Sequence, residues 1–421
     1  MTPSATYRVT VPSWLGRASS DERVAVWAWL LSRLLGLLVL SGSTFYPLVD
    51  SDVVNRYYPW AKLLQAGLLP WRDYAVEYPP GALPFMTLPG RFGEFEFQFV
   101  LLAFVADAFI ARTLWRARPG AAGAWLWIVL PILLGPLEWV RLDIFVAAAM
   151  VGYIRAIELR RWRAAGLCLA AATLLKLWPL ALLVVMWRLL DRSGRWRIAT
   201  WALFGTAALT VPVLAWGGAG GLRDMLRFQG GRGLEFESVW AFPYEVAHRF
   251  RLSSQWLQQG YGSIDVRAAH LVAYCIGFVL PAALLAVWFI CWRSGPHARI
   301  TVRGAALLLI AALLVSERVL SAQYVVWAVA VVALVAGEAS THSVKERTWL
   351  LGAAAAWAAS SQLVYPGLFV SLLSGGIAGF LAACVHVVCF LAWVVVAVRY
   401  ALRYRRVPPH APAPATALAP A

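Results

Sequence analysis

The chain has 421 residues, of which 61% are hydrophobic and only 14% carry a charge. A soluble domain carries about 25% charged residues, so this composition excludes an ordinary water-soluble fold. The formal net charge of +16 is high enough for a nucleic-acid-binding protein, but the basic residues stand between apolar segments, which is typical of membrane topology. We therefore predict an integral membrane protein that lies in a lipid bilayer and binds no nucleic acid.

Apolar segments follow one another along the chain and predict about twelve transmembrane helices. We place them at 24–45, 96–115, 121–138, 142–157, 164–176, 177–190, 196–216, 268–292, 302–316, 322–337, 347–364 and 377–399. The fold class is thus all-α, a polytopic helical bundle. The fifth and sixth spans are short and meet at the break Lys176-Leu-Trp-Pro179. Interrupted helices occur in membranes only where they line a cavity or are covered by protein.

Basic residues favour one side of this map. About 23 of the 37 Lys and Arg residues fall in loops on one face, whereas the other face has about 13 basic and about 14 acidic residues. The positive-inside rule makes the basic face cytoplasmic. Residues 1–23 are then a cytoplasmic N-terminal segment, 24–406 form one membrane domain, and the Pro/Ala-rich residues 407–421 form a disordered cytoplasmic tail. We expect the cell membrane as the location.

Two long loops, 46–95 and 217–267, lie on the outer face of this map. In the first, Asp52 precedes an amphipathic helix over 53–67 whose aromatic residues suit the headgroup level of a membrane. A second short helix is predicted to start at Pro79-Pro80 and to run to about Pro89, because proline is favoured in the first turn of a helix.

Ionisable residues at or near membrane depth are functional candidates, and here they gather on the outer face. They are Asp50, Asp52, Glu77, Arg141, Asp143, Lys176, Arg232, Glu237 and Arg318. Acids and bases that converge above a hydrophobic body suit a site that binds a phosphate-bearing lipid and deprotonates a polar acceptor.

The first loop also resembles a known family. The stretch SDVVNRYYPWAKLLQAGLLPWRDYAVEYPPGALPF (51–85) is similar to that of polyprenyl-phosphate-sugar-dependent glycosyltransferases with the GT-C fold, and most similar to glycosyltransferase family 87, the actinobacterial alpha-mannosyltransferases. Further similar stretches follow in the family's order: RLD (141–143), TLLKLWPLAL (173–182), RGLEFES (232–238), RVLSAQYVVW (318–327) and VYP (364–366). The family's Lys-x-x-Ser-Pro-Gln-Tyr becomes Arg318-Val-Leu-Ser-Ala-Gln-Tyr324, which keeps a cation but loses the proline.

The resemblance implies inverting transfer of a mannosyl or related hexosyl group from a polyprenyl-phosphate donor to an envelope glycolipid or glycan acceptor on the outer face. It places an essential acid after the first span, so Asp52 is our first candidate for the catalytic base and Asp50 the second. Lys176, Arg318 and Arg232 are the candidates for binding the donor phosphate. Substrate-binding candidates are Glu77, Tyr78, Arg141, Asp143, Glu237, Gln323 and Tyr324. No cofactor is expected; some relatives in the superfamily use a divalent metal, but this chain has no tight ligand motif, so a metal stays open.

Purely structural alternatives stand beside these roles. Asp52 would simply cap the helix at 53, Asp143 would pair with Arg141, and Glu237 would pair with Arg232 within the second loop. A membrane transporter or lipid flippase is the alternative function. Transporters usually show repeated halves and interrupted helices near the midplane, whereas no repeat is found here and the polar residues gather in the outer loops.

Two charged residues lie inside predicted spans. Counted from the cytoplasmic ends, Arg33 is about nine residues deep and Asp107 about eight, so their depths match. We predict a structural ion pair between them, because an unpaired charge at this depth is costly.

Overall fold

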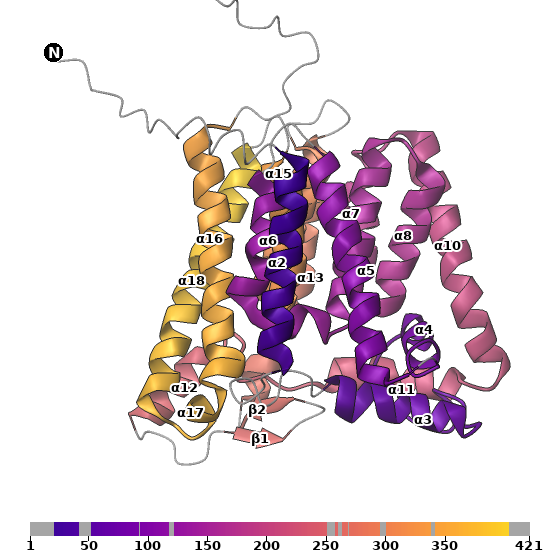
Figure 1. Cartoon of the computed structure of the whole chain (residues 1–421), viewed down its shortest axis with the longest axis horizontal. Coiled ribbons are helices and arrows are strands. Elements are labelled where there is room, and N and C mark those ends of the chain that lie inside the picture. Colours follow the sequence, from indigo (N-terminus) through magenta and orange to yellow (C-terminus); the bar gives the residue numbers. More distant parts are fainter. Residues whose placement is uncertain are drawn as a thin grey trace, which may run out of the picture.

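The computed structural model describes residues 21–41, 52–91, 93–117, 122–250, 257–259, 263–267, 269–294, 300–337 and 342–403. Long helices run side by side, and short helices and a hairpin gather at one end of the bundle (Figure 1). The elements are α2 (Glu22–Ser41), η1 (Val53–Tyr57), α3 (Tyr58–Gln65), η2 (Pro80–Ala82), α4 (Leu83–Thr87), α5 (Phe95–Arg116), α6 (Ala122–Leu134), η3 (Gly135–Trp139), α7 (Asp143–Glu158), α8 (Trp162–Leu175), α9 (Leu180–Met186), α10 (Arg192–Ala215), α11 (Ala219–Gly231), α12 (Phe242–Arg249), β1 (Leu257–Gln259), β2 (Ile264–Val266), α13 (His270–Ser294), α14 (Val302–Ser316), η4 (Ala322–Tyr324), α15 (Val325–Ala336), α16 (Val344–Gln362), η5 (Leu363–Gly367), α17 (Phe369–Leu373) and α18 (Ile377–Arg403).

Helices occupy the ranges of the predicted spans, with one clear difference. Where a span was predicted at 177–190, α9 has only seven helical residues, about 10 Å, which is far less than the roughly 30 Å of a hydrocarbon core. In the described part of the chain, five segments are long and apolar enough to cross a membrane: Phe95–Arg116, Ala122–Trp139, Arg192–Ala215, His270–Ser294 and Ile377–Arg403. The protein is therefore a mostly helical membrane protein, and the number of twelve spans stays a prediction.

The first loop forms the two short helices that its sequence predicts. The helix expected at 53–67 begins with the π-helical turn η1 and continues as α3, which ends at Gln65. The second begins at Pro80 as η2 and continues as α4. Asp52 stands at the cap position of η1, but its side chain makes no capping hydrogen bond. The capping alternative for Asp52 is therefore wrong.

The second loop is more ordered than its sequence suggests. It holds α11, α12 and the antiparallel hairpin of β1 and β2, which was not predicted. The RGLEFES segment lies along the hairpin, because Phe236 N donates to Ile264 O at 3.0 Å and Val266 N donates to Leu234 O at 2.7 Å. This places the loop at the same end as α3 and α4 (Figure 1).

The central helices of the bundle are buried by other helices, and the outside of the bundle exposes apolar side chains. Every residue of α15 is buried. Helices on the outside expose large apolar side chains instead, such as Trp27 on α2 (71% exposed), Leu203 on α10 (71%) and Leu271 on α13 (74%). Apolar surfaces of this extent are not tolerated in water, so lipid is expected to cover them.

The predicted pair of Arg33 and Asp107 is confirmed. Arg33 Nε and Nη2 each donate to an oxygen of the Asp107 carboxylate at 2.7 Å, and Trp127 Nε1 donates to Asp107 Oδ1 at 2.6 Å. The pair ties α2 to α5 and α6 in the middle of the bundle. Glu138, on η3, is fully buried within electrostatic reach of both residues, and neither of its oxygens has a hydrogen-bond partner among the described residues.

Candidate functional site

A cavity of about 1070 Å³ lies at the end of the bundle that carries α3, α11 and the hairpin. Its walls come from the first loop, the break between α8 and α9, the RGLEFES segment, the hairpin, α13 and the turn between α14 and α15. Ten sequence-predicted site residues line it: Asp52, Glu77, Tyr78, Arg141, Lys176, Arg232, Glu237, Arg318, Gln323 and Tyr324. Asp143 lies buried behind Lys176, and Asp50 lies outside the described residues. The cavity brings these residues together, and their roles stay predictions.

Two guanidinium groups hold the Asp52 carboxylate in the cavity wall. Its Oδ2 lies 3.2 Å from Arg141 Nε, and its Oδ1 lies 3.5 Å from Arg56 Nε. Arg56 also reaches Glu77, with 2.6 Å between Arg56 Nη1 and Glu77 Oε2. Burial raises the pKa of Glu77, and Arg56 acts in the opposite direction. Arg56 was not among the predicted site residues, although its place four residues after Asp52 on one helix face was a usable signal.

The RLD turn at the start of α7 makes two ion pairs that point in different directions. Arg141 and Asp143 were considered as partners of each other, and this is wrong: Arg141 contacts Asp52, whereas Asp143 Oδ1 lies 3.0 Å from Lys176 Nζ. Asp143 is the first residue of α7, where the helix dipole stabilises a carboxylate. The three residues of this turn thus hold two charged groups of the cavity, the Asp52 carboxylate and the Lys176 ammonium group.

Lys176 lies at the break between α8 and α9 and faces aromatic rings. Its Nζ is 4.2 Å from the ring centre of Tyr324 and 4.7 Å from that of Trp327, and the two rings stack on each other. Such cation–π contacts, together with Asp143, fix the ammonium group in place. The first loop reaches the same point, because a Cβ on Gly81 would lie only 2.5 Å from the carbonyl oxygen of Leu174. Only glycine permits this close approach.

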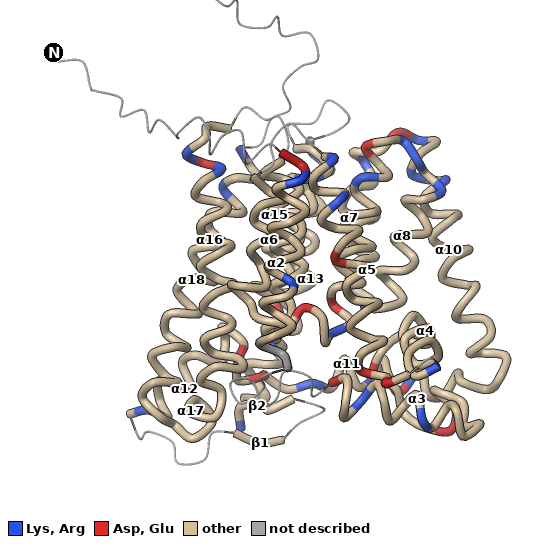
Figure 2. Tube along the Cα trace, in the orientation of Figure 1, with Lys and Arg blue, Asp and Glu red and all other residues tan. Residues whose placement is uncertain are grey.

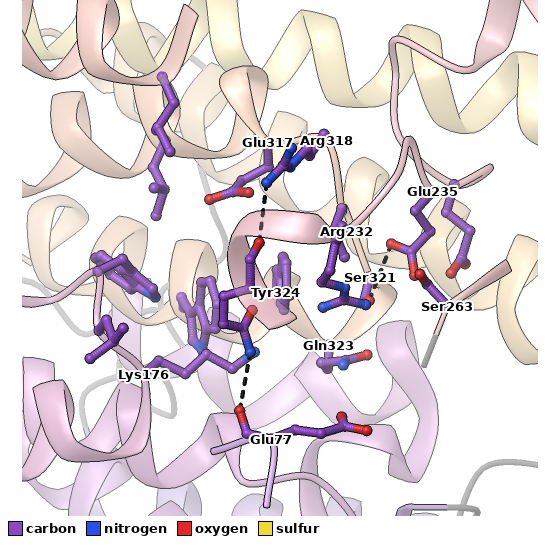
Figure 3. A pocket seen from close by; sticks show the side chains of 18 of the residues that line it. Glu77, Lys176, Arg232, Glu235, Ser263, Glu317, Arg318, Ser321, Gln323 and Tyr324 are labelled. Atoms are coloured by element: carbon purple, nitrogen blue, oxygen red, sulfur yellow. Dashed lines mark hydrogen bonds between the residues drawn. The ribbon is translucent and has the colours of Figure 1, made fainter. Parts of the chain in front are cut away.

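Arg232 lies in the cavity beside Ser321 and Gln323 (Figure 3). Its Nε is buried and makes no hydrogen bond with the described residues. The sequence also allowed a local ion pair between Arg232 and Glu237. Among the described residues, no nitrogen of Arg232 lies within 4 Å of a Glu237 carboxylate oxygen. Arg232 is therefore a cation in the cavity that remains open to a ligand.

Glu235 and Glu317 face the same cavity, and sequence analysis missed both. Burial raises the pKa of each carboxyl to about 7, and Arg232 counteracts this rise in both. Glu235 Oε2 lies 3.5 Å from Ser321 Oγ. Glu235 was within reach of the sequence, because alternate residues of an extended segment point to one side and Glu237 had already been singled out. Glu317 carried no such signal.

Arg318 has a structural part as well as its place in the cavity. Its Nη2 donates to the carbonyl oxygens of Gln229 at 3.1 Å and Gly230 at 2.7 Å, which closes the end of α11. Gln229 Nε2 in turn donates to the carbonyl oxygen of Glu77 at 3.1 Å. Arg318 thereby links the second loop to the first, and it is a weaker candidate for the donor phosphate than Lys176 or Arg232.

The described acids of the cavity are not arranged as a set of metal ligands. Among the described residues, no three His, Cys, Asp or Glu side chains converge as metal ligands would. Asp52 and Glu77 are both in contact with Arg56, whose charge would repel a cation placed beside them. We therefore derive no step through a metal.

One wall of the cavity is apolar and reaches the outer surface of the bundle. It includes Leu180 and Val184 of α9 and Ile276, Leu280 and Leu284 of α13. Leu180 is 50% exposed and Val184 is 53% exposed, so the described residues leave this apolar wall uncovered. The polar part of the cavity therefore borders an apolar surface between α9 and α13.

Comparison with known proteins relates the sequence to one family. The sequence model of glycosyltransferase family 87 matches residues 76–317, which is more than half of the chain. No curated protein and no solved structure matches the chain. The matched range contains Glu77, the RLD turn, Lys176 and Arg232, whereas Asp52 lies before it.

Proposed function

The chain belongs to glycosyltransferase family 87 and is therefore a glycosyltransferase, and we propose that it moves a mannosyl or related hexosyl group from a polyprenyl-phosphate donor to an envelope glycolipid or glycan. The observation that carries this proposal is a single cavity with three parts. It holds a carboxylate at Asp52, cations at Lys176 and Arg232, and an apolar wall between α9 and α13.

The donor has two chemically different ends, and the cavity has a surface for each. A polyprenyl tail would lie along the apolar wall and enter sideways from the bilayer, where Leu180 and Val184 are exposed. Its phosphate would then meet Lys176 and Arg232. Fixed cations of this kind stabilise the charge that develops on a leaving phosphate without any need for a general acid.

The transfer is a single displacement. The acceptor hydroxyl oxygen attacks the anomeric carbon from the face opposite the phosphate, the bond from that carbon to the phosphate oxygen breaks, and its electron pair leaves with the polyprenyl phosphate. The hydroxyl proton passes to the Asp52 carboxylate, which must lie in hydrogen-bond reach of that oxygen. The anomeric configuration is inverted, because one bond forms as the opposite one breaks.

The distribution of charge supports an outer-face site. Lys and Arg residues cluster at the end of the bundle opposite the cavity, whereas acids and bases mix around the cavity (Figure 2). Cytoplasmic loops are the ones enriched in Lys and Arg. We therefore propose that the cavity opens on the outer side of the cell membrane and that both termini are cytoplasmic.

The decisive experiment replaces the proposed base. Asp52→Asn keeps the size of the side chain but cannot accept the proton, so transfer from polyprenyl-phosphate-mannose to membranes of a deletion strain should fall about 10²–10⁴-fold. Asp73→Asn is the matched control, because Asp73 is an acid of the same loop that pairs with Arg72 outside the cavity. Size-exclusion chromatography in detergent should show the same folded peak for both variants.

Other outcomes would overturn parts of the proposal. If Asp52→Asn keeps near-normal turnover while Asp50→Asn is inactive, the base moves two residues upstream. If both variants transfer normally, the carboxylate mechanism fails. Movement of intact donor across proteoliposomes without any sugar transfer would favour a flippase instead.

A further inference from the structure

Arg141 connects the proposed base to a residue far along the chain. Its Nε lies 3.2 Å from Asp52 Oδ2, and its Nη2 donates to the hydroxyl oxygen of Tyr365 at 3.3 Å. Nη1 donates to the carbonyl oxygen of Val140 at 3.1 Å. Only 4% of the Arg141 side chain is exposed, so the guanidinium group is buried, with hydrogen bonds from Nη1 and Nη2 and an ion-pair contact from Nε to Asp52.

Tyr365 reaches this position because α16 does not continue through it. The helix passes into the turn η5, where Tyr365 has extended backbone angles of φ −128° and ψ 123°. This takes its side chain out of the helical spiral and into the cavity wall. Its ring packs edge-on against Phe369, with 4.9 Å between ring centres. The contact with Phe369 helps to hold the hydroxyl at the guanidinium group.

We infer that Arg141 and Tyr365 are positioning residues that orient the Asp52 carboxylate toward the acceptor hydroxyl. This inference rests on the proposed function and changes one expectation from the sequence, in which Arg141 was a substrate ligand. Arg141 Nε lies beside Asp52 Oδ2 and Arg56 Nε lies beside Oδ1, so each oxygen faces a different cation and rotation of the carboxylate is restricted. A base that is already oriented lowers the entropy cost of the proton transfer.

Arg141 lies inside the range that matches the family model, whereas its partners Asp52 and Tyr365 lie outside it. The matched range ends at residue 317 and begins at residue 76, so it includes Arg141 but neither Asp52 nor Tyr365. Arg141 therefore contacts two segments that lie outside the matched range. Tyr365 belongs to the VYP stretch, which the sequence resemblance singled out without a role.

Tyr365→Phe tests the inference with little risk to folding, because it removes only the hydroxyl. We expect kcat to fall about tenfold while KM for polyprenyl-phosphate-mannose stays unchanged, since the charge-assisted contact acts on the base and not on the phosphate. Tyr74→Phe is the matched control: it removes a hydroxyl that donates to the Trp60 carbonyl at 3.0 Å, outside the cavity. It should leave kcat unchanged.

Arg141→Ala should lower kcat at least 10²-fold, and guanidinium ions in the millimolar range should restore part of the rate, with Arg141→Lys intermediate. In the Asp52→Asn background, Tyr365→Phe should cause no further loss, because residues that act as a unit are not additive. An equal tenfold loss in that background would refute the inference, as would a rise in donor KM for Arg141→Ala without guanidinium rescue. Normal turnover of Asp52→Asn would instead refute the proposed base, so the two failures are distinguishable.

Discussion

Replacing Asp107 with alanine should destabilise the bundle by about 3–5 kcal/mol, the usual cost of removing one partner of a buried ion pair. The substitution removes two hydrogen bonds of 2.7 Å from Arg33 and the acceptor of Trp127 Nε1. Arg33 would keep its donations to Ser32 Oγ and to the carbonyl oxygens of Trp127 and Ile128, but it would lose its counter-ion. One unpaired charge at the centre of a membrane helix costs about 3 kcal/mol on insertion scales, which agrees with this range.

The surroundings of the pair predict an asymmetry between its two halves. Glu138 is a second buried acid within electrostatic reach of Arg33. Asp107→Leu leaves Arg33 with one acid nearby, whereas Arg33→Leu leaves two acids and no cation. We therefore expect Arg33→Leu to be the more damaging single change, and the double change Arg33→Leu with Asp107→Leu to recover at least half of that loss.

The assay is the apparent melting temperature in detergent, read from tryptophan fluorescence at a fixed scan rate. For a chain of this length, a loss of about 3–5 kcal/mol should lower that temperature by about 3–6 °C. Phe97→Leu, on the lipid-exposed face of α5, is a control that should change it by less than about 2 °C. If the double variant melts no higher than either single variant, the two side chains do not act as a pair and the reasoning is refuted.

Two further predictions concern sidedness and pH. In a cysteine-free background, a cysteine that replaces Arg227 on α11 (side chain 73% exposed) should react with an impermeant maleimide from outside. A cysteine that replaces Val344 (81% exposed) should react only after permeabilisation. The reverse labelling pattern would show that the proposed topology is inverted. Glu235 and Glu317 have pKa values of about 7, raised by burial, so they are neutral below this pH and ionised above it. The donor phosphodiester keeps one negative charge throughout, so its KM should fall about tenfold from pH 8 to pH 6. Glu317→Gln should flatten this slope and the exposed Asp224→Asn should not; an unchanged slope in Glu317→Gln would contradict the explanation. The stability that these raised pKa values contribute is present at low pH and is lost as the pH rises through about 7.

The helices were predictable because membrane crossing depends on a local property. A run of apolar residues of sufficient length specifies a helix without any knowledge of its neighbours, and the proline pair at Pro79-Pro80 specifies where a short one begins. The segment 177–190 shows the limit of this argument. It is apolar except for Arg188, but the helix starts only after Pro179 and ends at Met186, since the chain then turns into α10. Apolar composition alone does not specify such an end.

The residues of the candidate site were also largely predictable, because a charge near membrane depth is costly and is retained for a reason. The ion-pair and hydrogen-bond partners of these residues were not predictable. Short spacing made Arg141 and Asp143 the obvious pair, but the start of α7 sends their side chains to different neighbours. The contact of Arg141 with Tyr365 joins residues 224 positions apart, and no local pattern encodes it.

The charged groups of the site and their partners lie far apart along the chain, and this affects how the site is assembled. Two of the charged groups that we assign to the reaction are held by partners from other segments: Asp52 by Arg141, and Lys176 by Asp143. Both partners come from one turn, so a shift of that turn would displace the proposed base and the proposed phosphate-binding cation together. The distance between the two groups is thereby set by three consecutive residues of one turn. A transferase that must align an acceptor oxygen, an anomeric carbon and a leaving phosphate benefits from this arrangement, because misplacement by about 1 Å can cost about 10²-fold in rate.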